Sequence, residues 1–486
     1  MSDPIRFLLG RTPVEIDDAD PTTTVLEWLR GPARRCGTKE GCAEGDCGAC
    51  TVVLVEPDGA GGTSARTVNS CIQFLPTLDG KQVLTVEDLK AEDGTPHPVQ
   101  RAMIETHAAQ CGFCTPGFVM SLYHLHRTHK GQTPPGRETL DRALGGNLCR
   151  CTGYRPILDA GAKMFETPAQ PDPRDADLPA RLASLARGKG LAYRARDKVF
   201  LAPRTRAELA AALAAHPGAR ILSGGTDLGL EVPKAHKNIP ALIHLGEVAE
   251  LKRIVRTATH LELGAAVTWT RAFPALTELW PQLDELLARF AGPPIRNAGT
   301  LGGNIANASP IGDSPPVFLA LDADIELFGP NGSRTLKLAD FFLAYRKTAL
   351  APGEIVAGLR VPLPRPETKF AAYKVSKRFD DDISAVCGVF AIDMAANGTI
   401  AGARLAYGGM AAIPKRAARA EAALVGAPWT REAALRAGEA LAGDFAPLSD
   451  MRASAAYRAK VAANLLIRFH HETAGTGVAT RVIAYG

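Results

Sequence analysis

The residues best suited to chemistry are cysteines, and the first group lies in the run Gly41-Cys42-Ala43-Glu44-Gly45-Asp46-Cys47-Gly48-Ala49-Cys50. The three thiols have C-x4-C-x2-C spacing, and Cys71 follows as a possible fourth ligand. This spacing is typical of the plant-type [2Fe-2S] loop, and glycines let such a loop turn its N–H groups toward sulfur. A structural zinc site is the alternative, but zinc ligands usually come as two close pairs. The pattern therefore favours an iron-sulfur centre.

A second group of thiols follows at a distance, with Cys111 and Cys114 in a C-x2-C pair and Cys149 and Cys151 in a C-x-C pair. Each pair lies near the end of an expected helix, so two helical hairpins would bring four thiolates together. Zinc is a stronger rival here, because C-x-C alone does not decide between the metals. The presence of the first motif in the same chain favours a second iron-sulfur centre.

Two glycine-rich stretches suggest contact with a polar cofactor. The first, Ser223-Gly224-Gly225-Thr226-Asp227, follows an expected strand, where backbone N–H groups can converge on a phosphate. The second runs from Arg296 to Asp313 and is dominated by small residues and amides. Many such turns bind nothing, and a tight structural loop is the alternative. Two such loops in one region behind two cysteine motifs favour a flavin.

Composition bounds the class of protein. The chain has 486 residues, 46% of them hydrophobic and 22% charged, which fits three or four globular domains. A net charge of +5 with scattered basic residues gives no support to nucleic-acid binding. Neither a signal peptide nor a long apolar run is evident, so we expect a cytoplasmic protein with no membrane contact. In that compartment thiols stay reduced, and we expect the remaining Cys36 and Cys387 to be buried free thiols.

Hydrophobic patterns indicate the elements that position these motifs. We expect strands at 5–9, 14–16, 51–55 and 82–86, with a hairpin turn at 10–13 and a helix after 21–24. Helices are expected at 99–109, 117–128, 137–144 and 157–165, and a linker at 166–190. Further on, the patterns predict a strand at 199–201, a helix at 206–216 and strands at 220–222, 383–392 and 403–407.

Two stretches around the second thiol group carry a family resemblance. Gln110-Cys111-Gly112-Phe113-Cys114-Thr115-Pro116-Gly117 and Gly146-Asn147-Leu148-Cys149-Arg150-Cys151-Thr152-Gly153-Tyr154 resemble the two-cluster module of the molybdenum hydroxylases. That family includes xanthine dehydrogenase, aldehyde oxidase and carbon monoxide dehydrogenase. The resemblance implies a multidomain α+β fold in which all eight cysteines of the two groups are cluster ligands.

The resemblance also implies a division into domains. Residues 1–88 would form a β-grasp [2Fe-2S] ferredoxin domain and 89–165 a four-helix [2Fe-2S] domain, with a linker at 166–190. Residues 191–345 would form an α+β FAD-binding domain, and 346–486 a small C-terminal α+β flavoprotein domain.

Carried over by position, the resemblance implies roles for single residues. The first FAD-binding segment would comprise Ile221, Leu222, Ser223, Gly224, Gly225, Thr226, Asp227 and Leu228. Phosphate and ribose contacts would come from Thr300, Asn304 and Asp313, and a further FAD contact from Lys374. The catalytic candidates are Asp227 and Phe290 near the isoalloxazine, with Tyr345, Arg346 and Asp381 on the nicotinamide side. Without the resemblance, the acidic turn around Asp381 reads as a solvated surface turn. Gln110 matches a glutamine next to the pterin.

These parts imply an order of electron transfer: an outside donor, the helical-domain cluster, the β-grasp cluster, FAD and a final acceptor. No segment of the sequence resembles the large molybdenum domain, so we expect a separate molybdopterin-binding subunit, in a heterotetramer or larger assembly. The fusion of cluster and flavin parts resembles bacterial xanthine dehydrogenases. This resemblance implies oxidation of hypoxanthine to xanthine and of xanthine to urate. The partner subunit would bind the purine, and NAD would accept the electrons.

Two other functions remain open from sequence alone. One is the small subunit of an aldehyde or other heterocycle hydroxylase with a different acceptor. The other, from a different class, is a zinc-stabilised assembly module that carries no electrons.

Overall fold

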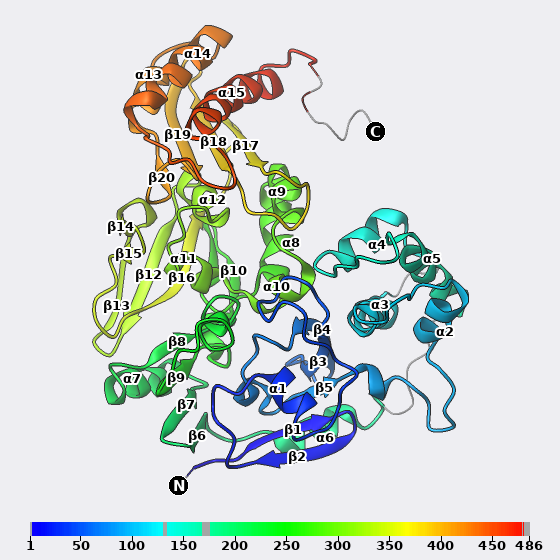
Figure 1. The fold of residues 1–486 in the computed structure, drawn as a ribbon. Coiled ribbons are helices and arrows are strands. Elements are labelled where there is room, and N and C mark those ends of the chain that lie inside the picture. The colour runs from blue at the N-terminus through cyan, green and yellow to red at the C-terminus, as the bar shows by residue number, and fades with distance from the viewer. Residues whose placement is uncertain (1, 130–133, 168–174, 479, 481–486) are drawn as a thin grey trace. The chain divides into compact units, whose positions relative to one another are not determined.

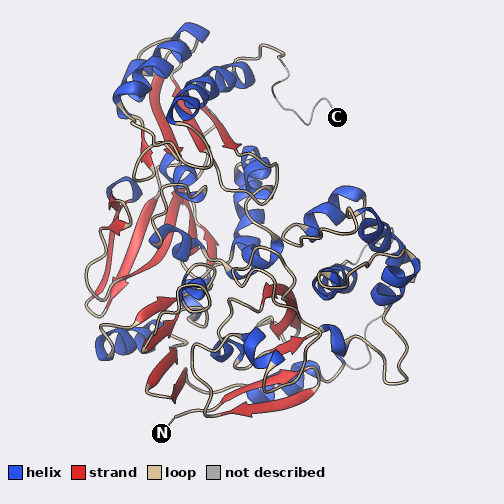
Figure 2. Cartoon of the chain, in the orientation of Figure 1, coloured by secondary structure: helices blue, strands red, loops and turns tan. Residues whose placement is uncertain are grey.

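The computed structural model describes residues 2–129, 134–167, 175–478 and 480 (Figures 1 and 2). Its contacts divide the chain into two compact units. Unit 1 comprises Met1–Ala249, Thr268–Thr270 and Ala291–Gly299, and unit 2 comprises Glu250–Val267, Arg271–Phe290 and Thr300–Gly486.

Unit 1 begins with a five-stranded sheet in the order β2-β1-β5-β3-β4. β1 pairs in parallel with β5, and the other pairings are antiparallel. The predicted hairpin is confirmed, but its turn is only Gly10-Arg11, because Leu9 already pairs with Thr12. The elements are β1 (Ile5–Leu9), β2 (Thr12–Ile16), α1 (Val25–Arg30), β3 (Thr51–Pro57), β4 (Thr63–Asn69) and β5 (Gln82–Leu84).

Strand β3 is buried on both faces and joins two hydrophobic cores. Val52 and Leu54 pack with residues of β1 and α1, whereas Val53 and Val55 pack with residues of α3 such as Phe118. Because side chains of a strand alternate between its faces, one β-branched run serves both cores. The strand begins directly after Cys50, which packs in a separate small cluster with Leu26, Cys71 and Ile72.

Four helices follow the sheet in unit 1, as predicted: α2 (Pro98–Glu105), α3 (Thr115–Thr128), α4 (Arg137–Leu144) and α5 (Arg155–Lys163). The bounds of α4 are as predicted, and the other helices begin or end a few residues away. α2 stops at Glu105, four residues early, since His107 adopts a left-handed backbone with φ of 54°.

The predicted linker at 166–190 contains a helix that the sequence pattern did not indicate. Residues 168–174 lie outside the described part of the chain, but Leu178–Leu185 forms helix α6. Leu178 and Leu182 are buried, and four residues of separation puts them on one face of the helix. The flanking prolines and charges concealed this short apolar period.

The remainder of unit 1 contains a second sheet in the order β6-β7-β9-β8, in which β7 and β8 run parallel to β9. The predicted strand-helix-strand unit is confirmed as β7, α7 and β8. The elements are β6 (Leu191–Ala195), β7 (Lys198–Ala202), α7 (Arg206–Ala215), β8 (Arg220–Leu222), β9 (Ala241–His244) and α10 (Pro293–Ala298).

Unit 2 contains one sheet in the order β10-β11-β16-β12-β13, a second in the order β17-β18-β19-β20 and the short hairpin β14-β15. Its strands are β10 (Ile254–Arg256), β11 (His260–Gly264), β12 (Asp324–Gly329), β13 (Gly332–Lys337), β14 (Phe342–Ala344), β15 (Lys347–Thr348), β16 (Ile355–Pro362), β17 (Thr368–Val375), β18 (Val386–Met394), β19 (Ile400–Gly408) and β20 (Lys415–Arg416). The predicted strand at 383–392 begins three residues later, and that at 403–407 is longer than predicted.

Helices flank these sheets. Alanine-rich α13, α14 and α15 pack on the second sheet of unit 2, where Phe390, Leu405 and Phe469 are fully buried (Figure 1). α8 begins in unit 1 and continues in unit 2. The helices are α8 (Trp269–Leu279), α9 (Asp284–Ala288), α11 (Leu301–Ala306), α12 (Ser314–Ala320), α13 (Ala418–Leu424), α14 (Arg431–Ala440) and α15 (Ala455–Thr473).

Candidate cluster and flavin sites

The first thiol group is assembled by the loop between α1 and β3 and by the turn after β4. Cys50 and Cys71 are buried, with 3.3 Å between their sulfur atoms. Asn69 supports the arrangement, since its Nδ2 donates to Gly45 O at 2.6 Å. The sheet therefore brings together thiols that lie 21 residues apart in sequence.

Cys42 is surrounded by donors. The backbone N–H groups of Glu44, Asp46 and Cys47 point at its sulfur from 3.5, 3.3 and 3.3 Å. Hydrogen bonds from the Cys47 and Cys71 thiols lower the pKa of Cys42, and the same contacts raise the pKa of Cys47 and Cys71. Four neighbouring sulfurs cannot all be thiolates unless positive charge lies among them, as a metal centre provides.

The second thiol group lies at the start of two helices. Cys114 is the residue before α3, and Cys151 precedes α5 by four residues. The sulfur atoms of Cys111 and Cys151 lie 3.4 Å apart. Tyr154 supports this group, because its hydroxyl accepts a hydrogen bond from Cys149 N at 3.0 Å.

The thiols of the second group also change one another's pKa. Burial, and then the Cys149 sulfur, raise the pKa of Cys114 to about 12. Burial would raise the pKa of Cys149 as well, but hydrogen bonds from Thr152 outweigh it and lower that pKa. The positive end of α3 further favours negative charge at Cys114.

The arrangement of the sulfurs bears on the kind of metal. Within the described residues, no three His, Cys, Asp or Glu side chains surround a point that suits one metal ion. In the first group Cys71 contacts Cys50 and Cys42, and Cys42 also contacts Cys47, whereas in the second group Cys111 contacts Cys151 and Cys114 contacts Cys149. A [2Fe-2S] centre takes four thiolates over two irons, and each thiol group supplies four cysteines. The residues present thus fit the iron-sulfur centre.

The two remaining cysteines differ in burial. Cys387 is buried as predicted, and its thiol donates to Asp313 O at 3.7 Å. The prediction that Cys36 is buried is wrong, because it lies exposed in the turn after α1.

The first predicted flavin segment lies in unit 1, directly against the turn that carries Cys71. Ile221 and Leu222 end β8, and Gly225 adopts a left-handed backbone with φ of 75°. Gln73 Nε2 donates to Gly224 O at 3.2 Å. Gly229 packs so closely that a Cβ there would lie 2.5 Å from Ile72 O. The turn that carries Cys71 and the predicted flavin segment are therefore in direct contact.

Most of the second predicted flavin segment, from Thr300 to Asp313, lies in unit 2, where Asp313 belongs to a buried ion pair. Asp313 Oδ2 lies 2.5 Å from Lys374 Nζ, and Asp313 Oδ1 accepts from Ser384 Oγ at 2.5 Å. Asn304 Oδ1 accepts from Ser314 Oγ at 2.5 Å. The structure thus brings Asp313 and Lys374 together from 61 residues apart.

Thr300 belongs to the same segment and caps α11 by accepting a hydrogen bond from Gly303 N at 3.2 Å. Gly302, in that helix, packs so tightly that a Cβ would lie 2.4 Å from the Cβ of Ala265. These small residues fix α11 against β11 and leave little freedom in the segment.

The predicted catalytic residues occupy different kinds of position. Phe290 is partly buried against Phe273, with 6.3 Å between ring centroids. Tyr345 and Arg346 form the exposed turn of the β14-β15 hairpin, and Arg346 has φ of 52°. Asp381, with φ of 50°, lies in the loop between β17 and β18.

The other predicted residues lie in unit 1. Thr226, Asp227 and Leu228 continue the first flavin segment. Gln110 is exposed beside Cys111, and an exposed residue at this place can meet a partner chain.

Sequence reasoning missed Arg289, the residue before Phe290. Its guanidinium donates to Lys374 O at 2.8 Å, Ser376 Oγ at 2.9 Å and Phe379 O at 2.8 Å, and it lies 4.6 Å from the centre of the Phe379 ring. It therefore holds the start of the loop that carries Asp381. No local signal marks such a residue, since its partners lie 85 to 90 residues away.

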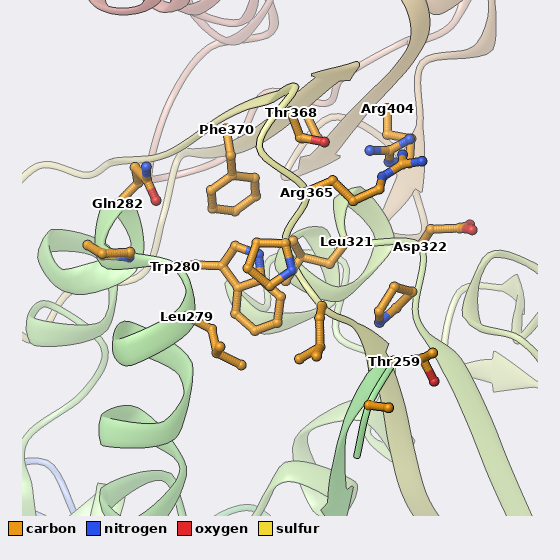
Figure 3. A pocket seen from close by; sticks show the side chains of 16 residues that line it. Thr259, Leu279, Trp280, Gln282, Leu321, Asp322, Arg365, Thr368, Phe370 and Arg404 are labelled. Carbon is orange, nitrogen blue, oxygen red and sulfur yellow. The ribbon is translucent and has the colours of Figure 1, made fainter. Parts of the chain in front are cut away.

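A cavity of about 670 Å³ in unit 2 lies among other residues (Figure 3). Trp280, Leu321 and Phe370 line it, and Arg365 and Arg404 lie together at one side. Both arginines pair with the carboxylate of Asp393, at 2.7 and 2.8 Å. None of the predicted site residues lines this cavity, so it is separate from the predicted flavin contacts.

Four family models match the chain in order. They are the 2Fe-2S iron-sulfur cluster binding domain at 7–73, the [2Fe-2S] binding domain at 85–162, the FAD binding domain in molybdopterin dehydrogenase at 193–364 and the CO dehydrogenase flavoprotein C-terminal domain at 371–473. Both thiol groups and both predicted flavin segments fall within these matches.

Among curated proteins, the chain is 33% identical to xanthine dehydrogenase of Emericella nidulans over 97% of this chain and 38% of that protein. It is 30% identical to xanthine dehydrogenase/oxidase of Gallus gallus over 90% of this chain and 37% of that protein. The chain thus spans little more than a third of the length of these relatives.

Among solved structures, carbon monoxide dehydrogenase from Hydrogenophaga pseudoflava is 30% identical with a TM-score of 0.52, over 55% of this chain and 94% of that chain. Quinoline 2-oxidoreductase from Pseudomonas putida 86 is 28% identical with a TM-score of 0.52, over 57% of this chain and 97% of that chain. In the described part of the chain, no helix has the length and apolarity to cross a bilayer.

Together the fold and the matches define an oxidoreductase component with two [2Fe-2S]-binding domains, an FAD-binding domain and a C-terminal flavoprotein domain. The predicted multidomain α+β fold is thereby confirmed. The chain belongs to the molybdenum hydroxylase family.

Proposed function

We propose that this chain conducts electrons from a molybdopterin-binding partner subunit to NAD during oxidation of hypoxanthine to xanthine and of xanthine to urate. When bound, the two [2Fe-2S] centres supply one-electron steps, and FAD links these to the two-electron chemistry of NAD. In this proposal, residues 1–88 and 89–165 hold the centres, and 191–345 and 346–486 hold and cover the flavin.

One observation carries the proposal: the turn after Cys71 contacts the first flavin segment through Gln73 and Gly224, at 3.2 Å. A proposed cluster ligand beside a proposed flavin-binding loop supports electron transfer between the two groups. The similarity to xanthine dehydrogenases over 90% or more of this chain supports the choice of purine substrates.

The side chains of the chain have separate roles in this proposal. Thr300, Asn304 and Asp313 bind phosphate and ribose, and Lys374, which pairs with Asp313, makes a further contact with FAD. Tyr345, Arg346 and Asp381 orient the nicotinamide, while Asp227 and Phe290 lie at the flavin ring. Gln110 contacts the pterin-bearing partner.

The test uses the intact complex, copurified with its partner and freed of oxygen. Xanthine is expected to drive formation of NADH, and a chelated, molybdenum-free preparation is the control that should form none. Bleaching of the cluster and flavin absorption by xanthine without NADH formation would remove NAD as acceptor.

A second candidate is the electron-transfer component of a heterocycle or aldehyde hydroxylase with a different acceptor. The similarity to quinoline 2-oxidoreductase, over 97% of that chain, favours it. In the same experiment, an aldehyde or a nitrogen heterocycle is added in place of xanthine. Bleaching of the cluster and flavin absorption by that compound, but not by xanthine, would support this second candidate.

A further inference from the structure

One side-chain hydroxyl in the second thiol group lies close to the sulfur of a proposed ligand. Thr152 Oγ1 is 3.1 Å from the sulfur of Cys149, and both residues are partly buried. The backbone donors around Cys42 in the first group lie farther from their sulfur, at 3.3 to 3.5 Å. The contact therefore joins a proposed ligand of the second centre to a group that can donate a hydrogen bond.

The surroundings of Thr152 decide which atom of this contact is the donor. Tyr154 N donates to Thr152 Oγ1 at 3.1 Å, so one lone pair of that oxygen is already used. A hydroxyl carries one hydrogen, whereas a cysteine that binds a metal is a thiolate and carries none. With Cys149 as a thiolate, the Thr152 hydroxyl must therefore donate and the Cys149 sulfur must accept.

Tyr154 fixes the hydroxyl in this place. Its backbone is left-handed, with φ of 68°, a conformation that residues other than glycine rarely adopt. In this conformation its N–H reaches Thr152, and its side-chain hydroxyl accepts from Cys149 N at 3.0 Å. Its ring packs edge-on against the buried Phe118 of α3, with 6.3 Å between ring centroids. Tyr154 thus holds both the donor and the acceptor of the contact between Thr152 and Cys149.

We infer that the Thr152 hydroxyl raises the reduction potential of the second centre by donating a hydrogen bond to the thiolate of Cys149. The inference rests on the proposed function. Reduction adds one electron to the centre and makes its thiolate ligands more negative, so a donor at the sulfur stabilises the reduced state more than the oxidised state. No proton moves, because the hydroxyl keeps its hydrogen in both states. In the proposed path, the higher potential favours entry of an electron from the partner subunit.

The test is a redox titration of the full chain loaded with both centres, followed by paramagnetic resonance. Thr152→Val keeps the shape of the side chain and removes the hydroxyl. It is expected to shift the reduction equilibrium of the second centre about tenfold toward the oxidised state, which is about 59 mV toward lower potential for a one-electron couple. The first centre, measured in the same sample, should keep its potential. Thr152→Ser restores a hydroxyl and should restore the potential of the unaltered chain.

Thr128→Val is the matched control. It is the same substitution at the far end of α3 from Cys114, and it removes an exposed hydroxyl that donates to His124 O at 2.7 Å, so neither potential should change. Thr152→Ala serves if the valine variant loses iron.

Unchanged potentials in Thr152→Val, or an equally large shift in Thr152→Ser, would overturn the inference. Loss of the second centre from both the valine and the alanine variants would also overturn it, because Thr152 would then be needed for assembly of the centre and not for its potential. Absence of both cluster signals from the unaltered chain would instead contradict the proposed function itself.

Discussion

Replacement of Cys149 by serine is expected to remove about half of the bound iron, because one of two [2Fe-2S] centres would lose a thiolate ligand. The other centre should survive, since its proposed ligands are Cys42, Cys47, Cys50 and Cys71 on separate loops. Electrons from the partner should then fail to reach the flavin, while NADH still reduces FAD from the other end. Iron and sulfide analysis with paramagnetic resonance of the reduced chain measures the loss.

Cys36→Ser provides the matched control for this change. It is the same substitution at an exposed thiol outside both groups, so iron content and both signals should be unaffected. Two full cluster signals in the Cys149→Ser chain would remove Cys149 from the ligands.

Replacement of Asp313 by asparagine is expected to release FAD and to destabilise unit 2 while leaving the iron content unchanged. Asp313 and Lys374 are 7% and 3% exposed, and their charged atoms lie 2.5 Å apart. Removal of one partner from a buried ion pair leaves the other charge uncompensated and costs roughly 3–5 kcal/mol. Flavin content and the free energy of unfolding are measured on the same preparation.

Two further variants separate flavin binding from stability. Asp324→Asn removes the same charge from the more exposed pair with Lys337, where the expected cost is about 0–1 kcal/mol and FAD should be retained. Asp313→Asn combined with Lys374→Met removes the uncompensated ammonium, so stability should recover in part and FAD should not. Full FAD occupancy in the Asp313→Asn chain would exclude Asp313 from the flavin site.

Much of the fold could be predicted because local patterns were strong. The β-branched run from Thr51 predicted β3, and the period of residues 137–144 predicted the bounds of α4. The predicted end of a helix was wrong where a left-handed backbone conformation sets that end, as at His107 after α2. Helix α6 was missed because only two buried leucines mark it.

For the candidate sites, the sequence predicts the thiol groups but not the residues that support them. Cysteine spacing identifies both thiol groups, since the chemistry of a cluster constrains the spacing itself. Gln73 and Arg289 carry no such signal, because each acts through a partner that is distant in sequence. Their roles depend on packing that brings separate loops together, and a sequence pattern does not report that packing.

We propose that this chain holds two [2Fe-2S] centres and a flavin as one electron-conducting series. The most direct test is anaerobic purification of the full chain from a host with intact cluster assembly, with iron, zinc and flavin analysis and paramagnetic resonance after reduction. We expect about four irons per chain, bound FAD and two distinguishable cluster signals. A folded chain that contains zinc in place of iron, with no flavin and no signal, would contradict it.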